Sequence, residues 1–452
     1  MKVTAVLLAA GQGTRMKSNL PKVLHPIAGK PMLWYALQAV EMASTQKPVV
    51  IVGYGAQQVS ALIGNSAHCV LQEPQLGTGH AVMQAEALLK GKTDYVIVTY
   101  ADMPLLRGET FQRLVEMQQK NSGPLTLLTV HADDPRGFGR ILRKPDGTVA
   151  AIVEEFVATP EQKAIKELNV GAYCFSADWL WDALHRIPLS PKGEYYLTDT
   201  VELAVWDGLP VQALLHDDLT ETIGINTRVH LAEAETLMRE RINRDLMLAG
   251  VTITDPASTY VEAGVKIGKD TVILPNTYIQ EETEIGEDCS IGPNTHIRNS
   301  KIGDRCKVFM SVMEGASLED DVDIGPFARL RQGAHLMSHV HMGNFGEVKD
   351  STLEAGVKMG HFSYIGNARI GASTNIGAGT ITCNFDGEKK HPTEVGENVF
   401  IGSDTMLVAP LKIGRGARTG AGAVVTKDVP EDTVVVGVPA RAIRRLTKHD
   451  SA

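Results

Sequence analysis

Cysteine is scarce in this sequence, and its placement gives no sign of a disulfide framework. The 452 residues include five cysteines, an odd number, and no two of them form a CxxC pair. They are Cys69, Cys174, Cys289, Cys306 and Cys383. Free thiols are typical of a reducing compartment, so we expect a cytoplasmic protein.

The start of the chain lacks an apolar run long enough for targeting or membrane insertion. It reads MKVTAVLLAAG, with eight apolar-leaning residues before the first glycine. A signal peptide needs a longer core with a cleavage site, and a membrane-spanning helix needs about 20 apolar residues. We therefore predict no association with a membrane.

Positive charge is not in excess. The chain has 44 Lys and Arg against 53 Asp and Glu, which gives a net charge of −9 at pH 7, and the basic residues are dispersed. A nucleic-acid-binding domain usually carries a concentrated basic patch. This composition argues against nucleic acid as a partner.

The two familiar phosphate-binding loops are also missing from the glycine-bearing stretch LLAAGQGTRMKSNLPK at residues 7–22. Gly11 and Gly13 lack the third glycine of a Rossmann fingerprint, and they are too close together for a P-loop. What remains is a strand, a tight glycine turn and two nearby cations, Arg15 and Lys22. The loop by itself leaves open an ordinary turn with solvated charges.

The first half of the chain alternates strands with helices. β-rich runs such as VTAVLLAA, PVVIVGY and DYVIVTYAD are separated by helical stretches such as PMLWYALQAVEMAS and GETFQRLVEMQQK. This alternation predicts a parallel sheet covered by helices on both faces. Ligands of such sheets bind at the carboxyl ends of the strands, which is where Gly11 and Asp102 fall.

From about Val265 onward, apolar residues recur every six positions. The series fall at 267, 273, 279, 285, 291 and 297, at 324, 330, 336, 342 and 348, and at 395, 401, 407, 413, 419 and 425. Only Thr419 among them is polar, and glycine follows many members. Hexapeptide repeats of this kind predict a parallel β-helix whose axis is filled by the repeated apolar residues. We interpret a break at Ser300 as a shortened step and residues between Cys383 and Glu394 as an inserted loop.

A long helix is predicted between the two halves. Its apolar stripe at helical spacing consists of Leu231, Ala234, Met238, Ile242 and Leu246. Asn226 or Thr227 can cap its start and Gly250 its end. With a rise of about 1.5 Å per residue, such a helix would span about 35 Å and connect two domains.

Four stretches carry a resemblance to one enzyme family. The first, LLAAGQGTRMKSNLPKVL, resembles the signature of sugar-phosphate nucleotidyltransferases. Two more, QEPQLGTGHA (72–81) and GEYYLTD (193–199), narrow the choice among the families that share this signature. The fourth, NIGAGTITCNFDG (375–387), lies within the hexapeptide repeats. Over essentially its whole length the chain resembles the bifunctional N-acetylglucosamine-1-phosphate uridyltransferase and glucosamine-1-phosphate acetyltransferase family.

The resemblance implies an α/β architecture in three parts. A Rossmann-like nucleotidyltransferase domain would occupy residues 1–226, a linking helix 227–250, and a left-handed parallel β-helix 251–452. The C-terminal domain would acetylate glucosamine 1-phosphate from acetyl-CoA, and the N-terminal domain would join the product to UTP and release pyrophosphate. The implied partners are these small molecules and further copies of the chain in a homotrimer.

For the uridyltransferase, the resemblance implies one nucleotide site and one sugar site. The nucleotide would be held by Leu8, Ala9, Ala10, Gly11, Lys22, Gln72, Gly77, Thr78, Tyr100, Ala101, Asp102 and Asn226, and the sugar by Gly139, Glu154 and Asn169. Asp102 and Asn226 would bind Mg²⁺, since carboxylate and amide oxygens suit a hard cation. The attacking phosphate is already ionised, so catalysis needs positioning and charge neutralisation, for which Arg15 and Lys22 are the candidates. Asp102 is also compatible with a helix cap.

For the acetyltransferase, the substrate ammonium must lose a proton before it attacks a thioester, a task that suits histidine. His361, in KMGHFSYIG, matches the family's base. By the same matching, glucosamine 1-phosphate would be held by Arg331, Lys349, Tyr364 and Asn375, and acetyl-CoA by Ala378, Asn384, Phe385, Ser403, Ala421 and Arg441. Asn384 would lie close to the reacting amine. We interpret the histidines at 335, 339 and 341 as surface residues rather than a zinc site.

Three positions depart from the commonest form of the family. Phe385 stands where a tyrosine is usual, which removes a hydroxyl. Ala101 replaces a glycine or serine. The end VVVGVPARAIRR lacks an arginine found in some members, and Arg441 could contact the CoA phosphate in its place.

Two other functions remain open on the sequence alone. A related nucleotidyltransferase could act on another sugar 1-phosphate or nucleotide and use its β-helix for regulation, but it would need neither His361 nor Asn384. A non-catalytic assembly subunit of the same two-domain plan would not require Arg15, Lys22 and Asp102 together. The joint presence of these residues favours the bifunctional enzyme.

Overall fold

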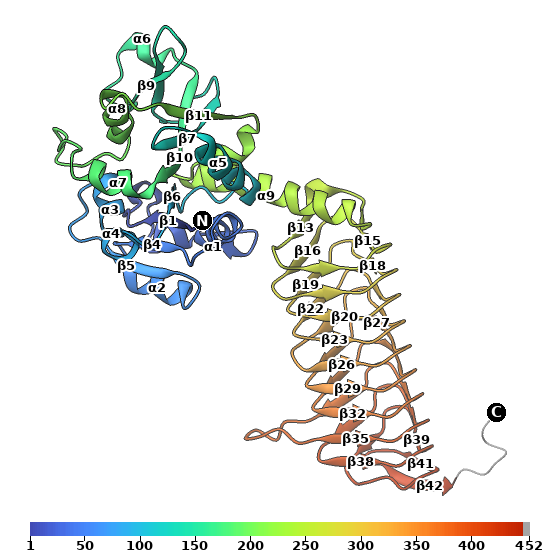
Figure 1. Ribbon diagram of the computed structural model, residues 1–452. Helices are drawn as coiled ribbons and strands as arrows, with labels where there is room; N and C mark the ends of the chain where they lie inside the picture. The colour runs from blue at the N-terminus through green and yellow to red at the C-terminus, as the bar shows by residue number, and fades with distance from the viewer. Residues whose placement is uncertain (446–452) are drawn as a thin grey trace. The chain divides into compact units, whose positions relative to one another are not determined.

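A computed structural model describes residues 1–445, which form two compact units. The first unit is Met1–Met238, and the second begins at Arg239 (Figure 1). None of the helices in the described residues combines the length and hydropathy needed to cross a membrane.

The first unit is built on a nine-stranded sheet. Its strands are β1 (Val3–Ala9), β4 (Val49–Val52), β5 (His68–Leu71), β6 (Tyr95–Tyr100), β7 (Leu125–His131), β8 (Arg140–Arg143), β9 (Val149–Val153), β10 (Glu167–Ser176) and β11 (Val211–His216). The order is β11-β7-β10-β6-β1-β4-β5, with β8 paired to β10 and β9 paired to β8. A separate two-stranded ribbon joins β2 (Pro26–Ile27) to β3 (Lys30–Pro31). The pairs β1–β4, β1–β6 and β4–β5 are parallel, as the alternating pattern predicted.

Strand β10 differs from this expectation, because it runs antiparallel to both β6 and β7. The chain between β7 and β10 forms the β8–β9 hairpin and only the short helix α6 (Pro160–Lys163). A parallel neighbour requires a crossover, usually a helix that packs across the sheet face. Without one, the chain re-enters the sheet at the end where it left, and the sheet is mixed.

Helices cover both faces of the sheet. They are α1 (Met32–Glu41), α2 (Ala56–Ile63), α3 (Thr78–Met83), α4 (Glu86–Leu89), α5 (Gly108–Lys120), α7 (Ala177–Leu184) and α8 (Asp199–Trp206), with short 3-10 turns at Thr14–Met16, Lys22–Leu24 and Leu219–Thr222. Leu7 of β1 packs in a core cluster with residues of α1, α2 and α5, and Leu8 packs in another with residues of α3, α7 and α8. This alternation along β1 is what a strand buried on both faces requires.

Helix α9 (Arg228–Leu248) confirms the predicted long helix and both caps. The Thr227 hydroxyl accepts the backbone N–H of His230 at 3.2 Å, and Gly250 ends the helix with φ of +100°. Ala234 and Met238 are buried in the first unit, whereas Ile242 and Leu246 pack against the core of the second.

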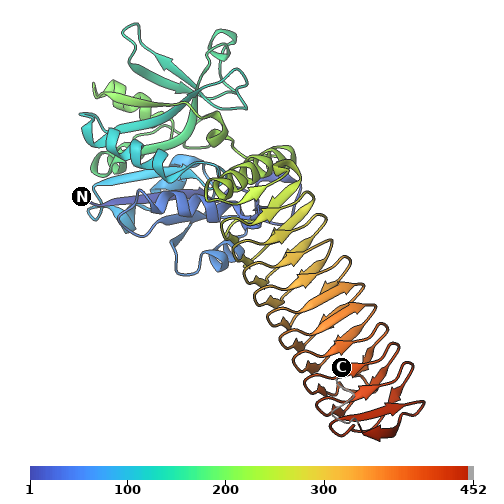
Figure 2. The same cartoon turned by 90° about the vertical axis from the view of Figure 1, so that its right-hand side faces the viewer.

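The second unit consists of three sheets whose strands stack turn upon turn (Figure 2). The first holds β12 (Thr252–Ile253), β15 (Val272–Ile273), β18 (Ser290–Ile291), β21 (Lys307–Val308), β24 (Asp323–Ile324), β27 (His341–Asn344), β30 (Lys358–His361), β33 (Asn375–Ile376), β36 (Phe400–Ile401), β39 (Arg418–Thr419), β41 (Thr433–Val436) and β42 (Arg441–Arg445). The second holds β13 (Thr259–Val261), β16 (Thr277–Gln280), β19 (His296–Arg298), β22 (Val312–Glu314), β25 (Arg329–Leu330), β28 (Glu347–Lys349), β31 (Tyr364–Gly366), β34 (Ile381–Cys383), β37 (Met406–Val408) and β40 (Val424–Val425). The third holds β14 (Lys266–Ile267), β17 (Glu284–Ile285), β20 (Lys301–Ile302), β23 (Ser317–Leu318), β26 (Ala334–Leu336), β29 (Ser351–Leu353), β32 (Ala368–Ile370), β35 (Thr393–Val395) and β38 (Leu411–Ile413). A 3-10 turn, Pro256–Ser258, precedes β13.

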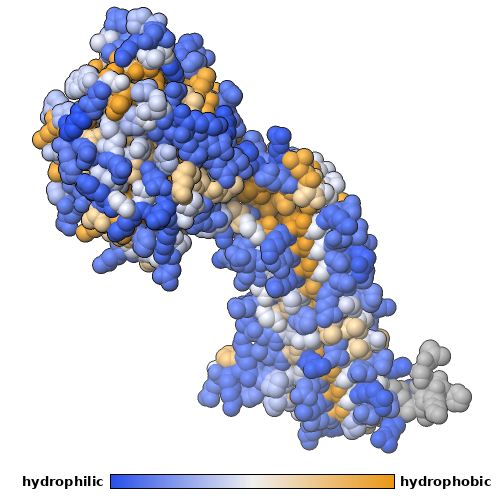
Figure 3. Space-filling model, viewed as in Figure 1, coloured by the Kyte–Doolittle hydropathy of each residue, from blue (hydrophilic) through white to orange (hydrophobic). Residues whose placement is uncertain are grey.

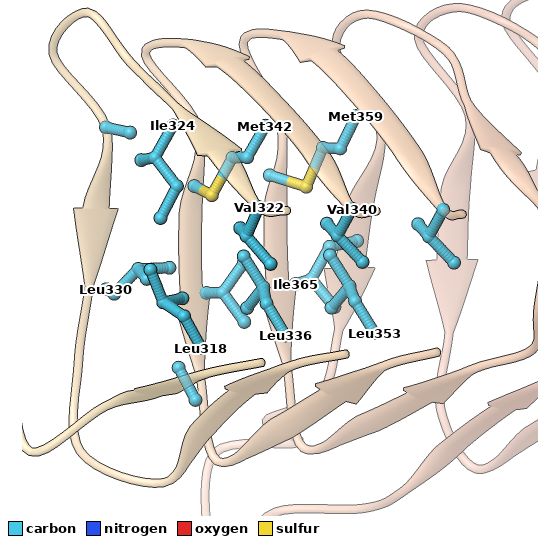
Figure 4. Close-up of a cluster of buried hydrophobic side chains, with 14 of the residues drawn as sticks. Leu318, Val322, Ile324, Leu330, Leu336, Val340, Met342, Leu353, Met359 and Ile365 are labelled. Carbon is cyan, nitrogen blue, oxygen red and sulfur yellow. The ribbon is translucent and has the colours of Figure 1, made fainter. Parts of the chain in front are cut away.

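Each strand up to β38 pairs in parallel with the strand one turn on, which confirms the parallel β-helix of hexapeptide repeats. The residues of the three six-residue series are buried, apart from the half-buried Ile267 near the first turn. Figure 4 shows Ile324, Met342 and Met359 in one row along the axis. Thr419 is buried with its hydroxyl oxygen accepting the Gly402 N–H at 2.9 Å, so its polar atom is satisfied.

Both breaks in the repeat have the predicted form. The apolar step across Ser300 shortens to five residues, from Ile297 to Ile302, and both of these residues are buried. β34 ends at Cys383 and β35 starts at Thr393, so residues 384–392 leave the stacked turns as a loop, which projects beside β35 in Figure 1.

Candidate functional site

A cavity of about 420 Å³ lies at the carboxyl ends of β1 and β6 in the first unit. It collects most of the residues predicted to bind the nucleotide. These are Leu8, Ala9, Ala10, Gly11, Arg15, Lys22, Gln72, Gly77, Thr78, Tyr100, Asp102 and Asn226. Ala101 is the exception, because its side chain is buried in the core and only its backbone N–H reaches across, to Leu8 O at 3.1 Å.

The loop that follows β1 owes its shape to Gly13. Its φ is +64°, and a Cβ on this residue would lie 2.6 Å from Cβ of Lys22. Only glycine therefore lets Lys22 pack against the turn. The Gly13 carbonyl accepts the N–H of Met16 at 2.9 Å, which closes a short turn that carries Arg15. Both cations of the loop consequently line the same cavity.

Four polar side chains meet in this cavity. Lys22 Nζ forms an ion pair with Asp102 Oδ2 and donates to Asn226 Oδ1 at 2.8 Å. Arg15 Nη2 donates to the same Asn226 oxygen at 2.8 Å. The N–H of Ile225 donates to the backbone oxygen of Asp102 at 3.0 Å, which places Asn226 beside the aspartate although they are far apart in sequence.

The pair Asp102 and Asn226 fits a hard divalent cation. One ammonium, that of Lys22, is bound by oxygens of both side chains, so both can reach a single cation. Within residues 1–445, no group of three or more His, Cys, Asp and Glu side chains is arranged to bind a metal. Two protein oxygens completed by phosphate and water oxygens are the donor set that Mg²⁺ prefers.

The motifs at 72–81 and 193–199 pack against each other at the far end of the cavity. Gln72 is buried, and its Nε2 donates to Gly77 O at 3.0 Å. Gly77 has φ of +95°, and a Cβ there would lie 2.6 Å from Tyr195 O. The Leu197 N–H donates to the Thr78 hydroxyl at 3.0 Å. These contacts form a rigid polar pocket next to the glycine loop.

The three residues predicted to hold the sugar do not line this cavity. Gly139 and Asn169 are joined by a backbone hydrogen bond, Asn169 N to Gly139 O, at 2.9 Å. The Asn169 Nδ2 donates to the Tyr173 hydroxyl at 2.7 Å, and the Thr198 hydroxyl donates to Glu154 Oε1 at 2.9 Å. They form a polar cluster beside Tyr100 rather than beside the cations.

Burial dominates the electrostatics of this cluster. It raises the pKa of the Glu154 carboxyl, and burial together with the charge of Glu154 raises the pKa of the Tyr100 hydroxyl. Burial, with repulsion from Glu202 and Glu154, raises the pKa of Asp199 to about 6. The cluster is therefore a desolvated, hydrogen-bonding region that suits an uncharged sugar, whereas the cations around Asn226 suit phosphates.

The structure adds cavity residues that no single-residue prediction named. They are Gly13, Thr14, Val23, Gln75, Ala81, Glu194 and Tyr196. Gln75 Nε2 donates to Ala10 O at 2.8 Å and so supports the loop from behind. Glu194 and Tyr196 belong to the GEYYLTD stretch, and that motif was the signal that could have identified them.

In the second unit, one straight column of residues runs through His361. The strand register places His361 opposite Asn344 on one side and leads to Ala378, Ser403 and Ala421 on the other. Successive turns are about 4.8 Å apart. Three of the residues predicted to contact acetyl-CoA, Ala378, Ser403 and Ala421, thus form a track of small side chains that starts at the candidate base.

The imidazole of His361 has one fixed partner. Its Nδ1 lies 2.6 Å from Asn344 Oδ1, across neighbouring strands. The side chain is exposed, at the end of β30 just before the chain turns into the next sheet. Asn344 was not predicted as a site residue.

Beyond this corner, cations gather on the next sheet. Arg331 Nη1 donates to Glu347 Oε1 at 2.9 Å, and Lys349 lies 3.4 Å from Asp350 Oδ2. Lys390, from the inserted loop, was also missed. The neighbouring ammonium of Lys349 lowers the pKa of Lys390, with a further contribution from Arg331. Such crowding of like charges favours the binding of an anion, and the interruption of the repeat at 384–392 was the signal for this loop.

Tyr364 and Asn384 meet over Gly366. A Cβ on Gly366 would collide with the Tyr364 hydroxyl and lie 2.8 Å from Asn384 Nδ2. Asn384 is buried and donates to Asn367 Oδ1 at 2.7 Å. Phe385, the next residue, is exposed in the inserted loop.

Other predicted residues of this unit lie apart from that group. Asn375 belongs to β33, in a different sheet from Arg331 and Lys349. Arg441 is exposed at the start of β42 and donates to its neighbour Ala440 O at 3.2 Å. The three surface histidines each face a carboxylate of the preceding turn, in the pairs His335–Glu319, His339–Asp321 and His341–Asp323.

Comparison with protein families finds two matches in this chain. Residues 5–190 match the MobA-like NTP transferase domain. Residues 264–299 and 392–427 match the bacterial transferase hexapeptide model of six repeats. The two matches fall in the first and the second unit respectively.

Curated relatives match the chain over nearly its full length. A protein of Syntrophomonas wolfei is 46% identical over 96% of this chain and 97% of its own. A protein of Streptococcus equi subsp. zooepidemicus is 43% identical over 99% of both chains, and one of Geobacillus sp. strain WCH70 is 46% identical over 100% of this chain and 97% of its own. All three are named bifunctional protein GlmU.

Proposed function

This chain belongs to the family of bifunctional GlmU proteins, and we propose how its two units divide the family's two reactions. The protein is an enzyme of UDP-N-acetylglucosamine synthesis with uridyltransferase and acetyltransferase activities. We assign the uridyltransferase to residues 1–226, the connecting helix to 227–250 and the acetyltransferase to 251–452. Two features of the chain support this assignment. The first unit has a glycine loop that carries Arg15 and Lys22, and the second has the exposed His361 at the start of a column of small residues.

In the uridyltransferase site, the cavity beside the glycine loop holds UTP. A phosphate oxygen of N-acetylglucosamine 1-phosphate attacks the α-phosphorus, and pyrophosphate leaves. Arg15 and Lys22 neutralise the charge that develops on the phosphate oxygens. Gln72, Gly77 and Thr78 hold the uracil, while Gly139, Glu154 and Asn169 hold the sugar. The attacking oxygen is already ionised, so no side chain has to accept its proton.

Asp102 and Asn226 hold the divalent cation of this site, for which Mg²⁺ is the expected ion. When bound, the cation supplies positive charge to the phosphate oxygens and orients them. Lys22 contacts both of these side chains, so its ammonium has to release them when a cation binds. It is then free to turn toward the nucleotide phosphates.

Replacing Lys22 by methionine therefore strengthens the binding of Mn²⁺ to the nucleotide-free protein, by about tenfold for roughly 1 to 2 kcal/mol of relieved competition. Titration of Mn²⁺ followed by electron paramagnetic resonance measures this without any turnover. Lys17→Met, which alters an exposed lysine of the same loop, serves as the control. Unchanged or weaker Mn²⁺ binding in Lys22→Met would remove Lys22 from the cation's place.

In the acetyltransferase site, Nε2 of His361 takes a proton from the ammonium of glucosamine 1-phosphate. The neutral amine nitrogen then attacks the thioester carbonyl of acetyl-CoA, the C–S bond breaks, and the proton that the nitrogen loses as it becomes an amide goes to the thiolate of CoA. Arg331, Lys349, Lys390 and Tyr364 hold the sugar phosphate, and Asn384 lies near the amine. Ala378, Ser403 and Ala421 line the path of the CoA arm, while Phe385 and Arg441 contact its outer parts.

We propose that the acetyltransferase unit works as a homotrimer. Phe327, Phe345 and Phe362 form an exposed ladder beside His361, with ring centroids 5.4 and 5.0 Å apart. Figure 3 shows apolar surface among the charged residues along this unit. Exposed apolar patches of this kind mark interfaces between proteins. A second subunit would also supply an Asn375 to the sheet that carries Arg331, which the chain's own Asn375 does not share.

Phe345→Glu therefore lowers the mass measured by analytical ultracentrifugation from three chains toward one and reduces acetyl transfer with it. Uridylyl transfer persists, because its residues lie in the other unit. Trp206→Glu, which changes an exposed aromatic residue of the first unit, leaves the trimer intact. A fully active monomer would contradict the proposal.

The assignment of substrates is tested by omission. The protein receives glucosamine 1-phosphate, acetyl-CoA, UTP and Mg²⁺ together and with each one left out, and mass spectrometry identifies the products. Without UTP, N-acetylglucosamine 1-phosphate accumulates. Without acetyl-CoA, no nucleotide sugar forms unless N-acetylglucosamine 1-phosphate is supplied.

A further inference from the structure

The hydrogen bond between Asn344 and His361 has a defined direction. Asn344 ends β27 and His361 ends β30, and the two residues are register partners in adjacent strands. Asn344 Oδ1 lies 2.6 Å from Nδ1 of the imidazole. An amide oxygen only accepts hydrogen bonds, so Nδ1 carries the proton and Nε2 keeps its lone pair.

We propose that Asn344 is a positioning residue for acetyl transfer, which holds His361 in the tautomer and ring orientation that a general base needs. The inference rests on the proposed role of His361 as that base. Within residues 1–445, no protein group hydrogen bonds to Nε2, so this nitrogen remains available to the substrate ammonium. Without Asn344, the ring is free to rotate and to place its proton on Nε2, and the neutral imidazole is then unable to accept a proton there.

A second histidine, at the start of the strand that ends at Asn344, has a different kind of partner. His341 also presents Nδ1 to the preceding turn, where Asp323 Oδ2 lies 3.1 Å away. The partner of His341 is therefore a charged carboxylate, whereas the partner of His361 is a neutral amide. Asparagine fixes the ring through an acceptor that carries no charge.

Titratable groups near His361 can also contribute to the pH dependence of acetyl transfer. The titratable groups on the strands and turns that adjoin it are His341, Glu347, Lys358 and Tyr364, and Asp404 lies one turn further on, beside Ala378. None of them replaces Asn344 as a partner of Nδ1. We therefore expect a substitution at residue 344 to be the main cause of any shift in the acid limb of the pH–rate profile for acetyl transfer.

The test compares Asn344→Ala with Asn344→Asp in the full-length protein, with kcat and KM for acetyl transfer measured from pH 5.5 to 9. Asn344→Ala lowers kcat by about 10- to 100-fold with little change in the KM for glucosamine 1-phosphate, by analogy with the loss of other groups that orient an imidazole. Asn344→Asp restores kcat to within several-fold of the wild type. The acid limb of its pH–rate profile moves to higher pH, because an added carboxylate beside the ring favours the protonated imidazole.

The control is Asp323→Ala, which removes the partner of His341 in the same geometry and leaves acetyl transfer unchanged. Sedimentation of each variant as the wild type does, in analytical ultracentrifugation, reports that its β-helix has folded. A wild-type kcat for Asn344→Ala, or an acid limb that does not move in Asn344→Asp, would overturn the inference. Full activity of His361→Ala would instead overturn the proposed base itself, so the two failures are distinguishable.

Discussion

Replacing His361 by alanine lowers the rate of acetyl transfer by about 10²- to 10⁴-fold, the usual contribution of a general base, and leaves uridylyl transfer intact. The imidazole is exposed, its Nδ1 is hydrogen bonded to Asn344, and the small residues Ala378, Ser403 and Ala421 follow it in register. Within residues 1–445, no other histidine lies in that column. The measurement is the initial rate of each reaction, with N-acetylglucosamine 1-phosphate supplied directly for the second.

His335→Ala provides the matched control for His361→Ala. His335 is another exposed histidine of the β-helix, and it faces Glu319 of the preceding turn. Its removal should leave both reactions at wild-type rates. Loss of both activities in a folded His361→Ala protein would show that the two reactions do not have separate sites.

Replacing Asp102 by alanine lowers Mg²⁺-dependent uridylyl transfer by about 10³-fold or more, since a metal ion contributes several kcal/mol to charge stabilisation. The variant loses a carboxylate that follows β6 directly and shares the Lys22 ammonium with Asn226. Acetyl transfer persists, because the residues proposed for its site lie in the second unit. Initial rates at several Mg²⁺ concentrations, together with direct Mn²⁺ titration, measure the effect.

Asp133→Ala is the control for Asp102→Ala. Asp133 is exposed and pairs with Lys166 at 2.7 Å, outside the cavity. It should bind Mn²⁺ as the wild type does. Full uridylyl transfer by Asp102→Ala at ordinary Mg²⁺ concentrations would remove this aspartate from the cation site.

Much of the fold could be predicted because its signals are local. A six-residue period leaves few alternatives to stacked turns, and the stripe from Ala234 to Leu246 marked a helix whose Thr227 and Gly250 caps are present. The direction of β10 was not predictable in the same way. It depends on the path of the β8–β9 hairpin, which no local run of residues specifies.

The site was predictable where a motif encodes it and not where it depends on register. A strict repeat of three six-residue steps would place His361 opposite Gly343, eighteen positions earlier. One step of this turn is five residues long, from Val348 to Leu353, so the partner is Asn344, seventeen positions away. Lys390 likewise reaches Lys349 only because the inserted loop folds back, with a bridge between Phe385 and Lys390.

The central claim is that two separate sites in one chain perform two consecutive reactions, and mixing the two variants tests it most directly. His361→Ala and Asp102→Ala are purified separately, and each is supplied with glucosamine 1-phosphate, acetyl-CoA, UTP and Mg²⁺. Neither alone forms appreciable UDP-N-acetylglucosamine, whereas the mixture forms it through released N-acetylglucosamine 1-phosphate, as mass spectrometry would show. A mixture as inactive as its components, with both proteins folded, would contradict the account.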